Sequence, residues 1–535
     1  MTFARLNNSY LVELWTFIKY ALTGVFNTVL TYLVYVILVY IHMQPSLSLA
    51  IGYLIGMISS YAINSRWTFK KTTNPWSYFW RFLIINLLIL VLSEVTLHEL
   101  LHVIHSADIA QLINVIPMTL IGFLSNRFLV FVPSASSTSL KGSQTGVSIP
   151  AKLNGFQKEL FIFSLITVVI QHLWLTFTSL VELLLHKERV NWYNLFIGNY
   201  RHWDSGWYVE IARNGFITLK QTAFWPLYPL FMRITHDVTQ TGYAASGIIV
   251  SFIAFVFFLY FLGRIATIEF GPHVARATIL LFAFFPTAYY FDAVYTESLF
   301  MVFCVAAIDR AMANKFWTAG LLASLATLTR NTGVFLDLIL LFEYLRHRDM
   351  NLHFWTSVWW KKLNTQVFAL TLPAVFLSLY MIYLKNLTGH FLAFLTAEKY
   401  WHRQYMPLWD TYYLSWLRMI HSSGWFHEYF FTEVSMVTLA ICMAIIGMRY
   451  VRRSYRQLSW WLYLIVVLWI ASTEPSMNAK DYLVSFPRYI LMLFPGFIYL
   501  GSAANYVRAT PLIVVLFAIG LGFLGNMFFH GVWIA

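Results

Sequence analysis

The segment Arg201-His-Trp-Asp-Ser-Gly-Trp-Tyr208 places one acid beside two basic side chains and two indole rings. A carboxylate such as Asp204 can act as a general base, taking the proton of a hydroxyl while its oxygen forms a new bond. Cationic groups bind phosphate oxygens, and aromatic faces suit the C–H surfaces of sugars. The segment therefore predicts sugar transfer from a phosphate-linked donor. The substrate-binding candidates within it are Arg201, His202, Trp203 and Trp207.

Helix capping explains the same segment without any chemistry. Aspartate is favoured at helix N-caps, so Asp204 would accept hydrogen bonds from the first turn of a helix over 205–212. That helix would then be an amphipathic segment at the membrane surface. The segment by itself does not separate the two interpretations.

The composition is that of an integral membrane protein. Hydrophobic residues make up 59% of the chain, charged residues only 11%, and the mean hydropathy is +0.64, whereas soluble domains carry charge on about a quarter of their residues. The net charge of +13 does not predict nucleic-acid binding, because the basic residues lie at span ends and form no dense stripe. Cys304 and Cys442 lie in apolar runs, so neither a disulfide framework nor a metal site is expected.

Hydropathy predicts an all-α polytopic membrane protein in two parts. Residues 1–133 contain four spans, at about 18–41, 47–65, 82–104 and 110–132, each near the length of about 20 residues that crosses a bilayer. Residues 134–155 are rich in Ser, Thr and Gly and predict a flexible linker. Residues 156–535 contain about eleven further spans with external loops.

The distribution of Lys and Arg among the short loops predicts the orientation of the spans. It places the N-terminus and the linker in the cytoplasm. The segments expected on the extracytoplasmic face are 187–232, 291–297, about 329–332, 386–428 and 474–487. Asp204 therefore faces outward.

The first domain contains an internal echo. Asn64-Ser-Arg-Trp-Thr-Phe69 and Asn126-Arg-Phe-Leu-Val-Phe131 end the second and fourth spans alike. Such an echo indicates duplicated helix pairs, as in transporters, although basic and aromatic residues also anchor helices at an interface. Glu94 lies deep in the third span. Burying a carboxylate in the membrane costs free energy, so this residue is either functional or hydrogen-bonded to a neighbouring helix.

The four-span plan, Phe17-Ile-Lys-Tyr-Ala-Leu-Thr-Gly24 with Asn27, and both Asn-x-x-x-x-Phe ends resemble the GtrA-like family over residues 10–133. The resemblance implies a small membrane domain that helps to move or recruit a polyprenyl-phosphate-linked sugar. The residues expected to serve this role are Asn27, Asn64, Arg66, Glu94, Asn126 and Arg127.

Further motifs follow Trp203-Asp-Ser-Gly-Trp-Tyr208 in a fixed order. They are Ala223-Phe-Trp-Pro-Leu-Tyr-Pro-Leu230, Phe285-Pro-Thr-Ala-Tyr-Tyr290, Tyr295-Thr-Glu-Ser-Leu-Phe300, Leu328-Thr-Arg-Asn-Thr-Gly333, Ser485-Phe-Pro-Arg-Tyr489 and Leu493-Phe-Pro495. Together they resemble the PIG-V-like mannosyltransferases of the GT-C class of membrane glycosyltransferases, over roughly residues 156–500.

This resemblance implies a role for each matching residue. Asp204 corresponds to the family's essential acid and is the expected general base. Glu297 is the second expected catalytic acid, in contact with the acceptor or supporting the site. Arg330 and Arg488 are expected to bind the lipid phosphate.

Three positions outside that core set leave alternatives open. Arg403 lies in the long loop 386–428 and either reaches a phosphate or is a solvated interfacial charge. Asp292 is either a second acid near Glu297 or a local turn cap. Asn331 stands where many members of the family have Pro, which leaves the turn after Arg330 undefined.

The resemblance implies an inverting transferase that moves a hexose, mannose by analogy, from a polyprenyl-phosphate sugar to an extracytoplasmic glycan, glycolipid or protein. No cofactor is expected and a metal is not required, because a polyprenyl phosphate is a serviceable leaving group. A cytoplasmic synthase of the donor is an expected partner. By analogy with the two families, their fusion on one chain implies the cytoplasmic membrane of the cell. Two alternatives stay open. A flippase would depend on Glu94 and not on Asp204, and a scaffold would depend on no single carboxylate.

Overall fold

The computed structural model describes two parts of the chain. In the N-terminal part it covers residues 45–68 and separate positions between 16 and 126, and beyond that residues 152–534 with gaps at 186–188, 351–359, 402, 474 and 477–480. Contacts divide the chain into two compact units, 1–146 and 147–535. Regular structure in these residues is helical, apart from isolated bridges of Ser476 with Arg403 and Asp481. The all-α prediction is confirmed.

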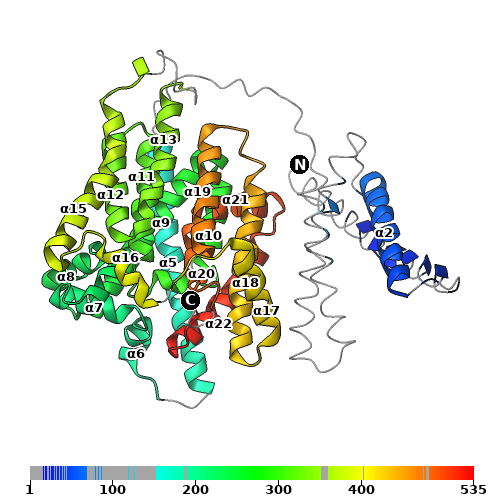
Figure 1. Cartoon of the computed structure of the whole chain (residues 1–535), viewed down its shortest axis with the longest axis horizontal. Coiled ribbons are helices and arrows are strands. Elements are labelled where there is room, and N and C mark those ends of the chain that lie inside the picture. Colours follow the sequence, from blue (N-terminus) through cyan, green and yellow to red (C-terminus); the bar gives the residue numbers. More distant parts are fainter. Residues whose placement is uncertain are drawn as a thin grey trace. The chain divides into compact units, whose positions relative to one another are not determined.

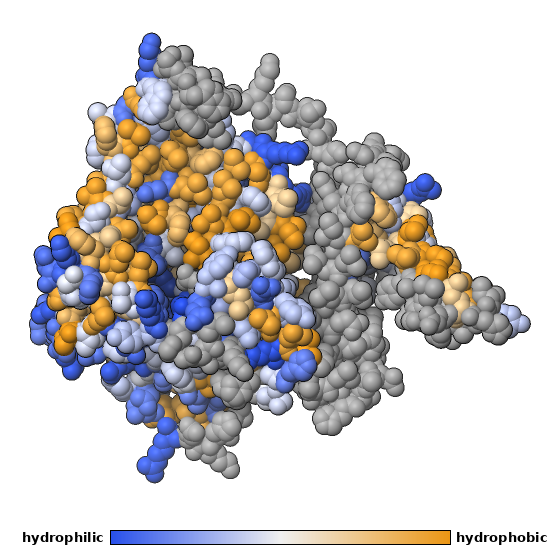
Figure 2. All heavy atoms as spheres, in the orientation of Figure 1, coloured by the Kyte–Doolittle hydropathy of each residue, from blue (hydrophilic) through white to orange (hydrophobic). Residues whose placement is uncertain are grey.

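Five of the described helices are long and apolar enough to cross a membrane. They are 157–183 within α5 (Lys152–Leu185), α9 (Tyr243–Phe270), 365–388 ending with α15 (Leu372–Thr388), 429–447 within α18 (Trp425–Gly447) and α22 (Thr510–Phe529). Hydrophobic residues cover much of the visible surface of the larger unit (Figure 2), as expected of a surface that faces lipid. The protein is a multi-pass membrane protein.

The linker ends earlier than the composition predicts. Helix α5 begins at Lys152, so the last part of the predicted linker 134–155 is helical. The Ser/Thr/Gly-rich stretch up to residue 151 lies outside the described residues.

Shorter helices form the centre of the larger unit. Helices α10 (Pro272–Ala283), α11 (Glu297–Met312) and α12 (Phe316–Thr329) follow α9, and α11 packs against both α9 and α12 (Figure 1). A Cβ on Gly320 of α12 would lie 2.1 Å from the carbonyl oxygen of Ala369, next to α15. Glycine therefore permits the close approach of these two helices, as is common between membrane helices.

The remaining helices surround this centre. They are α13 (Leu336–His347), α17 (Leu408–His421), α19 (Tyr455–Ser472) and α21 (Phe494–Tyr506). Short elements fill the connections: α6 (Trp192–Phe196), η3 (Gly198–Tyr200), α7 (Ser205–Asn214), η4 (Leu219–Ala223), α8 (Leu227–Thr239), η5 (Ala288–Phe291), η6 (Asn331–Phe335), η7 (Thr365–Thr371), α16 (Ala393–Glu398), η8 (Lys399–Trp401), α20 (Phe486–Tyr489) and η9 (Ile490–Met492). Helices α6, α7 and α8 gather at one end of the unit, the lower end in Figure 1.

A buried ionic network joins three helices at the other end. Arg456 of α19 pairs with Glu343 of α13 and with Glu269 of α9. Arg346 Nε donates to Glu343 at 2.9 Å, and Gln457 Nε2 donates to Glu269 at 2.7 Å. Buried charges are tolerated only when they are paired and hydrogen-bonded in this way. The network therefore fixes α9, α13 and α19 against one another.

The N-terminal unit gives the internal echo a structural counterpart. Helix α2 (Pro45–Ile63) leads into the π-helix η1 (Asn64–Thr68), and Asn126 also has π-helical backbone. Both asparagines are buried: Asn64 Nδ2 donates to Ser60 at 3.3 Å and Asn126 Nδ2 donates to Tyr20 at 3.2 Å. The asparagines that begin the two copies therefore share π-helical backbone and burial.

Of the other four residues expected to act in this domain, the structure describes two. The amide of Asn27 is buried and has no hydrogen-bond partner among the described residues, and Arg66 is exposed. Glu94 and Arg127 lie outside the described residues.

Candidate active site

Four charged side chains from distant parts of the chain form one continuous row. Arg488 Nη1 donates to Asp204 Oδ2 at 2.6 Å, and its Nε donates to Glu297 Oε1 at 2.8 Å. Arg330 Nη1 donates to the same Glu297 oxygen at 2.8 Å. Two carboxylates and two guanidinium groups therefore balance in formal charge. The structure brings together both expected acids and both expected phosphate-binding arginines.

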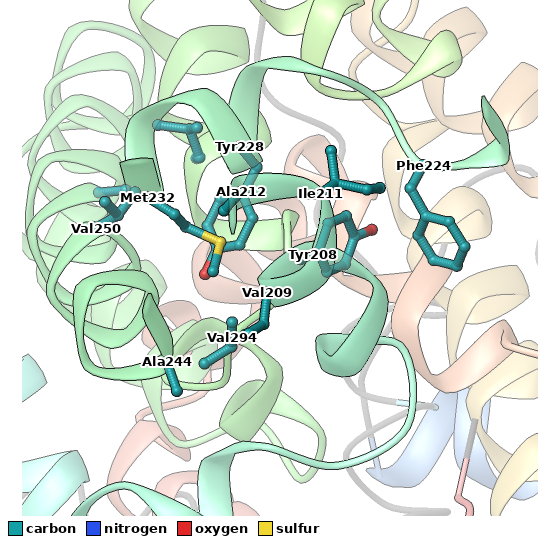
Figure 3. Close-up of a cluster of buried hydrophobic side chains, with 12 residues drawn as sticks. Tyr208, Val209, Ile211, Ala212, Phe224, Tyr228, Met232, Ala244, Val250 and Val294 are labelled. Carbon is teal, nitrogen blue, oxygen red and sulfur yellow. The ribbon is translucent and has the colours of Figure 1, made fainter. Parts of the chain in front are cut away.

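A buried hydrophobic cluster holds the helix that follows Asp204. Tyr208, Ile211 and Ala212 on one face of α7 pack with residues of α8 and α9 and with Val294, as Figure 3 shows. The Tyr228 hydroxyl anchors α8 by donating to the Gly247 carbonyl at 3.0 Å. Because this face of α7 is buried, the position of Asp204 at its N-terminus is fixed by packing.

Asp204 occupies the N-cap position without capping the helix. Its backbone is already α-helical, with φ −57° and ψ −25°, and its side chain makes no hydrogen bond to the first turn of α7. The carboxylate turns instead to Arg488. Its Oδ1 atom has no partner among the described residues, and the side chain is 22% exposed. The capping interpretation of this aspartate is therefore not what the structure shows.

Glu297 is the anchor of the row. It is the first residue of α11 and its side chain is 1% exposed. One oxygen accepts from both guanidinium groups, while Oε2 is buried and has no partner in the part of the chain that the structure describes. A group enclosed in this way is out of reach of an acceptor hydroxyl. Of the two roles that the sequence leaves open for Glu297, the geometry favours support of the site over contact with the acceptor.

Arg488 comes from the single-turn helix α20. Ser485 before this helix has left-handed backbone with φ 66°, and Pro487 lies in its first turn. The guanidinium carbon lies 4.6 Å from the ring centroid of Tyr295. Burial disfavours the charge, but Glu297 and Asp204 outweigh it and hold the pKa of Arg488 well above its ordinary value. Arg488 is therefore a fixed cation.

Arg330 ends α12 in extended backbone, with φ −156° and ψ 141°. Asn331 is the first residue of η6, a position whose N–H needs no partner within the helix. Proline is tolerated there, and it favours an extended residue before it. The extended backbone of Arg330 and the place of Asn331 at the start of η6 are therefore compatible with the proline that many members of the family have.

Tyr489 connects Arg403, the remaining predicted arginine, to the row of four charged side chains. The guanidinium carbon of Arg330 lies 5.5 Å from the Tyr489 ring centroid, and Arg403 Nη1 donates to the Tyr489 hydroxyl at 3.3 Å. Arg403 Nε also lies 3.9 Å from Glu398 Oε2. Tyr489 and Tyr295 both lie within the ordered motifs, although the motifs alone predict no role for them. Their place directly beside Arg488 and near Glu297 in those motifs was the available signal.

His202 differs from its expected role as a phosphate-binding cation. Its ring packs against Phe528 of α22, with centroids 5.6 Å apart, and its carbonyl accepts from the Tyr295 hydroxyl at 3.1 Å. Burial lowers the pKa of His202 below its ordinary value. A neutral ring turned toward α22 does not bind phosphate, so His202 instead shapes the loop through its backbone.

The other side chains of the loop are spread over different surroundings. Trp203 has left-handed backbone with φ 54°, is 49% exposed and packs against Trp533. Trp207 stacks on Phe224, with Lys220 Nζ 5.2 Å from its ring centroid. Arg201 is exposed and makes no ion pair among the described residues. Of the two indoles, Trp203 offers the freer face to a sugar.

Asp292 serves neither of the roles that the sequence allowed. Its carboxylate accepts from Gln171 Nε2 at 2.8 Å and lies 3.3 Å from His172 Nδ1, both on α5. This aspartate joins the η5 turn to α5 and is not part of the charged row.

The fold and the site define a class: a helical multi-pass membrane protein with a carboxylate–arginine site at one end of its bundle. Residues 161–520 match the family described as mannosyltransferase (PIG-V), and the chain belongs to that family. Residues 19–131 match the GtrA/DPMS transmembrane domain. Both resemblances predicted from the motifs are confirmed.

Individual relatives match over shorter stretches. GPI mannosyltransferase 2 of Schizosaccharomyces pombe is 29% identical over 185 residues, covering 32% of this chain and 38% of the relative. Human GPI alpha-1,6-mannosyltransferase 2 is 26% identical over 148 residues, covering 26% and 30%. The matches span about a third of the length of these curated relatives. No solved structure gives a significant match to the chain.

Proposed function

We propose that this protein is an integral membrane mannosyltransferase that uses a polyprenyl-phosphate-linked sugar and acts on a hydroxyl group of an extracytoplasmic acceptor. One observation carries the proposal. The side chain of Asp204 makes no capping hydrogen bond to α7. Its Oδ2 atom accepts from Arg488, and its Oδ1 atom has no partner among the described residues. A fixed, partly exposed carboxylate with one free oxygen is suited to act as a general base.

The proposed reaction is a direct displacement. The acceptor hydroxyl gives its proton to Asp204 Oδ1 while its oxygen forms a bond to the anomeric carbon of the sugar. The bond from that carbon to the phosphate oxygen breaks, and its electron pair leaves with the polyprenyl phosphate. A single displacement of this kind inverts the anomeric configuration.

The arginines provide the charge that the leaving phosphate requires. Arg330 Nη1 is engaged by Glu297, whereas Arg330 Nε and Nη2 have no partner among the described residues. These donors are free to bind phosphate oxygens, and charge-assisted hydrogen bonds of this kind are stronger than neutral ones. Arg403 lies next to them through Tyr489. Glu297 holds Arg330 and Arg488 in place, so it acts as a positioning residue.

Two further observations support the orientation and the sugar. Asp204, Glu297, Arg330 and Arg403 come from four of the five segments that the loop charges predict on the extracytoplasmic face, and Arg488 directly follows the fifth, 474–487. Hydrogen bonds link these side chains, in part through Tyr489. The named relatives are mannosyltransferases. The GtrA-like domain would then translocate or recruit the donor, and the acceptor is a glycan, a glycolipid or a protein.

Transfer by the full chain in liposomes tests this proposal with polyprenyl-phosphate mannose as the donor. Asp204→Asn keeps the size of the side chain and removes the base, and we expect a loss of about 10²-fold or more. The matched control is Glu210→Gln, the same chemical change at an exposed position of α7, which should retain activity. Normal transfer by Asp204→Asn contradicts the proposal. Donor movement across the bilayer without any transfer by the unaltered protein would instead indicate a flippase.

A further inference from the structure

A groove of about 690 Å³ runs between α8, α9 and α11 on the larger unit. Its walls are mostly apolar, with Phe257 and Phe261 on one side and Leu299, Val302 and Phe303 on the other. The volume lies in the range of about 300–1,000 Å³ that is typical of small-molecule sites. Phe257 is 41% exposed, so the groove opens on the apolar surface of the bundle.

One end of this groove is basic. Arg264 Nε donates to Asp309 Oδ1 at 2.9 Å, and Arg310 Nε donates to Asp309 Oδ2 at 3.0 Å. Arg264 Nη1 also lies 3.4 Å from the Tyr260 hydroxyl. Two cations therefore share one buried carboxylate and leave one positive charge uncompensated.

Both arginines keep a donor for a ligand. Arg264 Nη2 and Arg310 Nη1 have no hydrogen-bond partner in the described part of the chain, and the two side chains are 17% and 29% exposed. Both line the groove, whose lining contains no acidic side chain. One anionic group at this end would balance the charge and accept hydrogen bonds from both guanidinium groups.

The basic end lies far from the candidate active site. Glu297 begins α11, and Arg310 follows 310 − 297 = 13 positions later, near the end of the same helix, which corresponds to a rise of about 20 Å. Helix α9 runs beside α11 in the same sense, because a Cβ on Gly247 near its start would lie 2.7 Å from Val294. Arg264 is therefore also at the far end of the bundle.

From these contacts we infer that the groove binds one anionic phospholipid from the leaflet opposite the candidate active site. Its phosphate accepts from Arg264 and Arg310, and an acyl chain lies along the apolar wall toward Leu299. The inference does not depend on the proposed transfer reaction. The phosphate of a sugar carrier in that reaction would lie beside Arg330, at the other end of α11, so the two lipids occupy separate places.

Native mass spectrometry of the detergent-purified full chain tests this site, with equal amounts of phosphatidylglycerol and phosphatidylcholine of the same chain length. Both lipids carry a phosphate, but the choline cation of phosphatidylcholine cancels the negative charge that would balance the uncompensated guanidinium. The unaltered protein is therefore expected to retain phosphatidylglycerol about tenfold more than phosphatidylcholine. Arg310→Gln removes the uncompensated charge while Arg264 still pairs with Asp309. This variant should lose the preference.

Two further variants separate lipid binding from other effects. Arg276→Gln removes an exposed positive charge from α10, outside the groove, and should keep the preference. Val302→Phe adds bulk at a half-buried position of the groove wall and should reduce retention of both lipids, which tests the site even where an arginine variant fails to fold.

The inference is overturned by any of three results. They are equal retention of the two phospholipids by the unaltered protein, equal behaviour of Arg310→Gln and Arg276→Gln, and displacement of phosphatidylglycerol by polyprenyl phosphate in a manner that depends on Arg310. The second result would show that the arginines serve only the orientation of the chain, and the third that the groove belongs to the carrier.

Discussion

Glu297→Gln removes the carboxylate on which two arginines converge, and it offers the sharpest test of the charged row. The change keeps the size of a side chain that is 1% exposed, so any effect comes from charge and hydrogen bonding. Arg488 would keep only Asp204, and Arg330 would keep no carboxylate at the distances seen here.

The expected destabilisation follows from the burial of these groups. Arg488 and Arg330 are 6% and 14% exposed, so water solvates neither of them fully once Glu297 is neutral. Removing one partner of a buried ion pair costs about 3–5 kcal/mol, because the other charge stays buried without compensation. Arg330 can recover part of its hydration, so a value near 3 kcal/mol is expected for the loss in unfolding free energy.

Thermal unfolding of the full chain in detergent measures this effect through a cycle of variants. Glu297→Gln should lower the unfolding midpoint by several degrees. Glu297→Gln combined with Arg330→Gln should unfold at a higher temperature than Glu297→Gln alone, because the uncompensated guanidinium is gone. Residues that share one network show coupling of about 0.5–3 kcal/mol in such cycles.

Two control variants show whether the loss of stability is specific to Glu297. Glu210→Gln makes the same chemical change at an exposed site of α7 and should leave the midpoint unchanged. Asp204→Asn should lower it little, because Arg488 keeps Glu297 as a partner. An unchanged midpoint for Glu297→Gln, or effects of the two substitutions that simply add, would refute the anchoring role of this glutamate.

Three further predictions concern residues around the site. Gly333→Ala should destabilise the protein by about 1–3 kcal/mol, measured as a lower unfolding midpoint, because the added Cβ would lie 2.5 Å from the Thr327 backbone nitrogen. Asn331→Pro should change stability by less than about 0.5 kcal/mol, since Arg330 before it is already extended; a marked loss of stability or activity would show that the turn differs. The lowered pKa of His202 means that the folded state disfavours its protonation. Stability should therefore fall as the pH drops below the ordinary histidine value of about 6.5, and His202→Gln should make the midpoint less sensitive to acid over that interval.

The motifs predict most of the candidate site because its charges lie inside short, ordered segments. Asp204, Glu297, Arg330 and Arg488 each occupy a motif, and the structure joins them into one row. Hydropathy likewise predicts the helical fold, since blocks without charge leave no alternative to membrane helices. Loop charges also predict that Asp204, Glu297 and Arg330 lie on one side of the membrane.

Other features depend on contacts that no local pattern encodes. His202 stands next to Asp204 in sequence, yet its ring faces α22 because Phe528, far along the chain, packs against it. Asp292 is bound by α5 side chains 120 and 121 positions away. The enclosure of Glu297 between two arginines is equally non-local. The sequence shows that this acid belongs to the site, but the fold is needed to tell whether it reacts or positions other residues.

The single carboxylate oxygen shared by Arg330 and Arg488 also bears on how a turnover ends. In the proposed reaction the donor is a phosphodiester with one negative charge, whereas the released polyprenyl phosphate is a monoester that carries closer to two near neutral pH. A site of bare guanidinium groups would hold this spent carrier more tightly than the incoming donor, and inhibition by product would follow. Glu297 offsets part of that attraction in advance. Its burial therefore favours carrier release, and a variant without this carboxylate should be inhibited by lower concentrations of free polyprenyl phosphate.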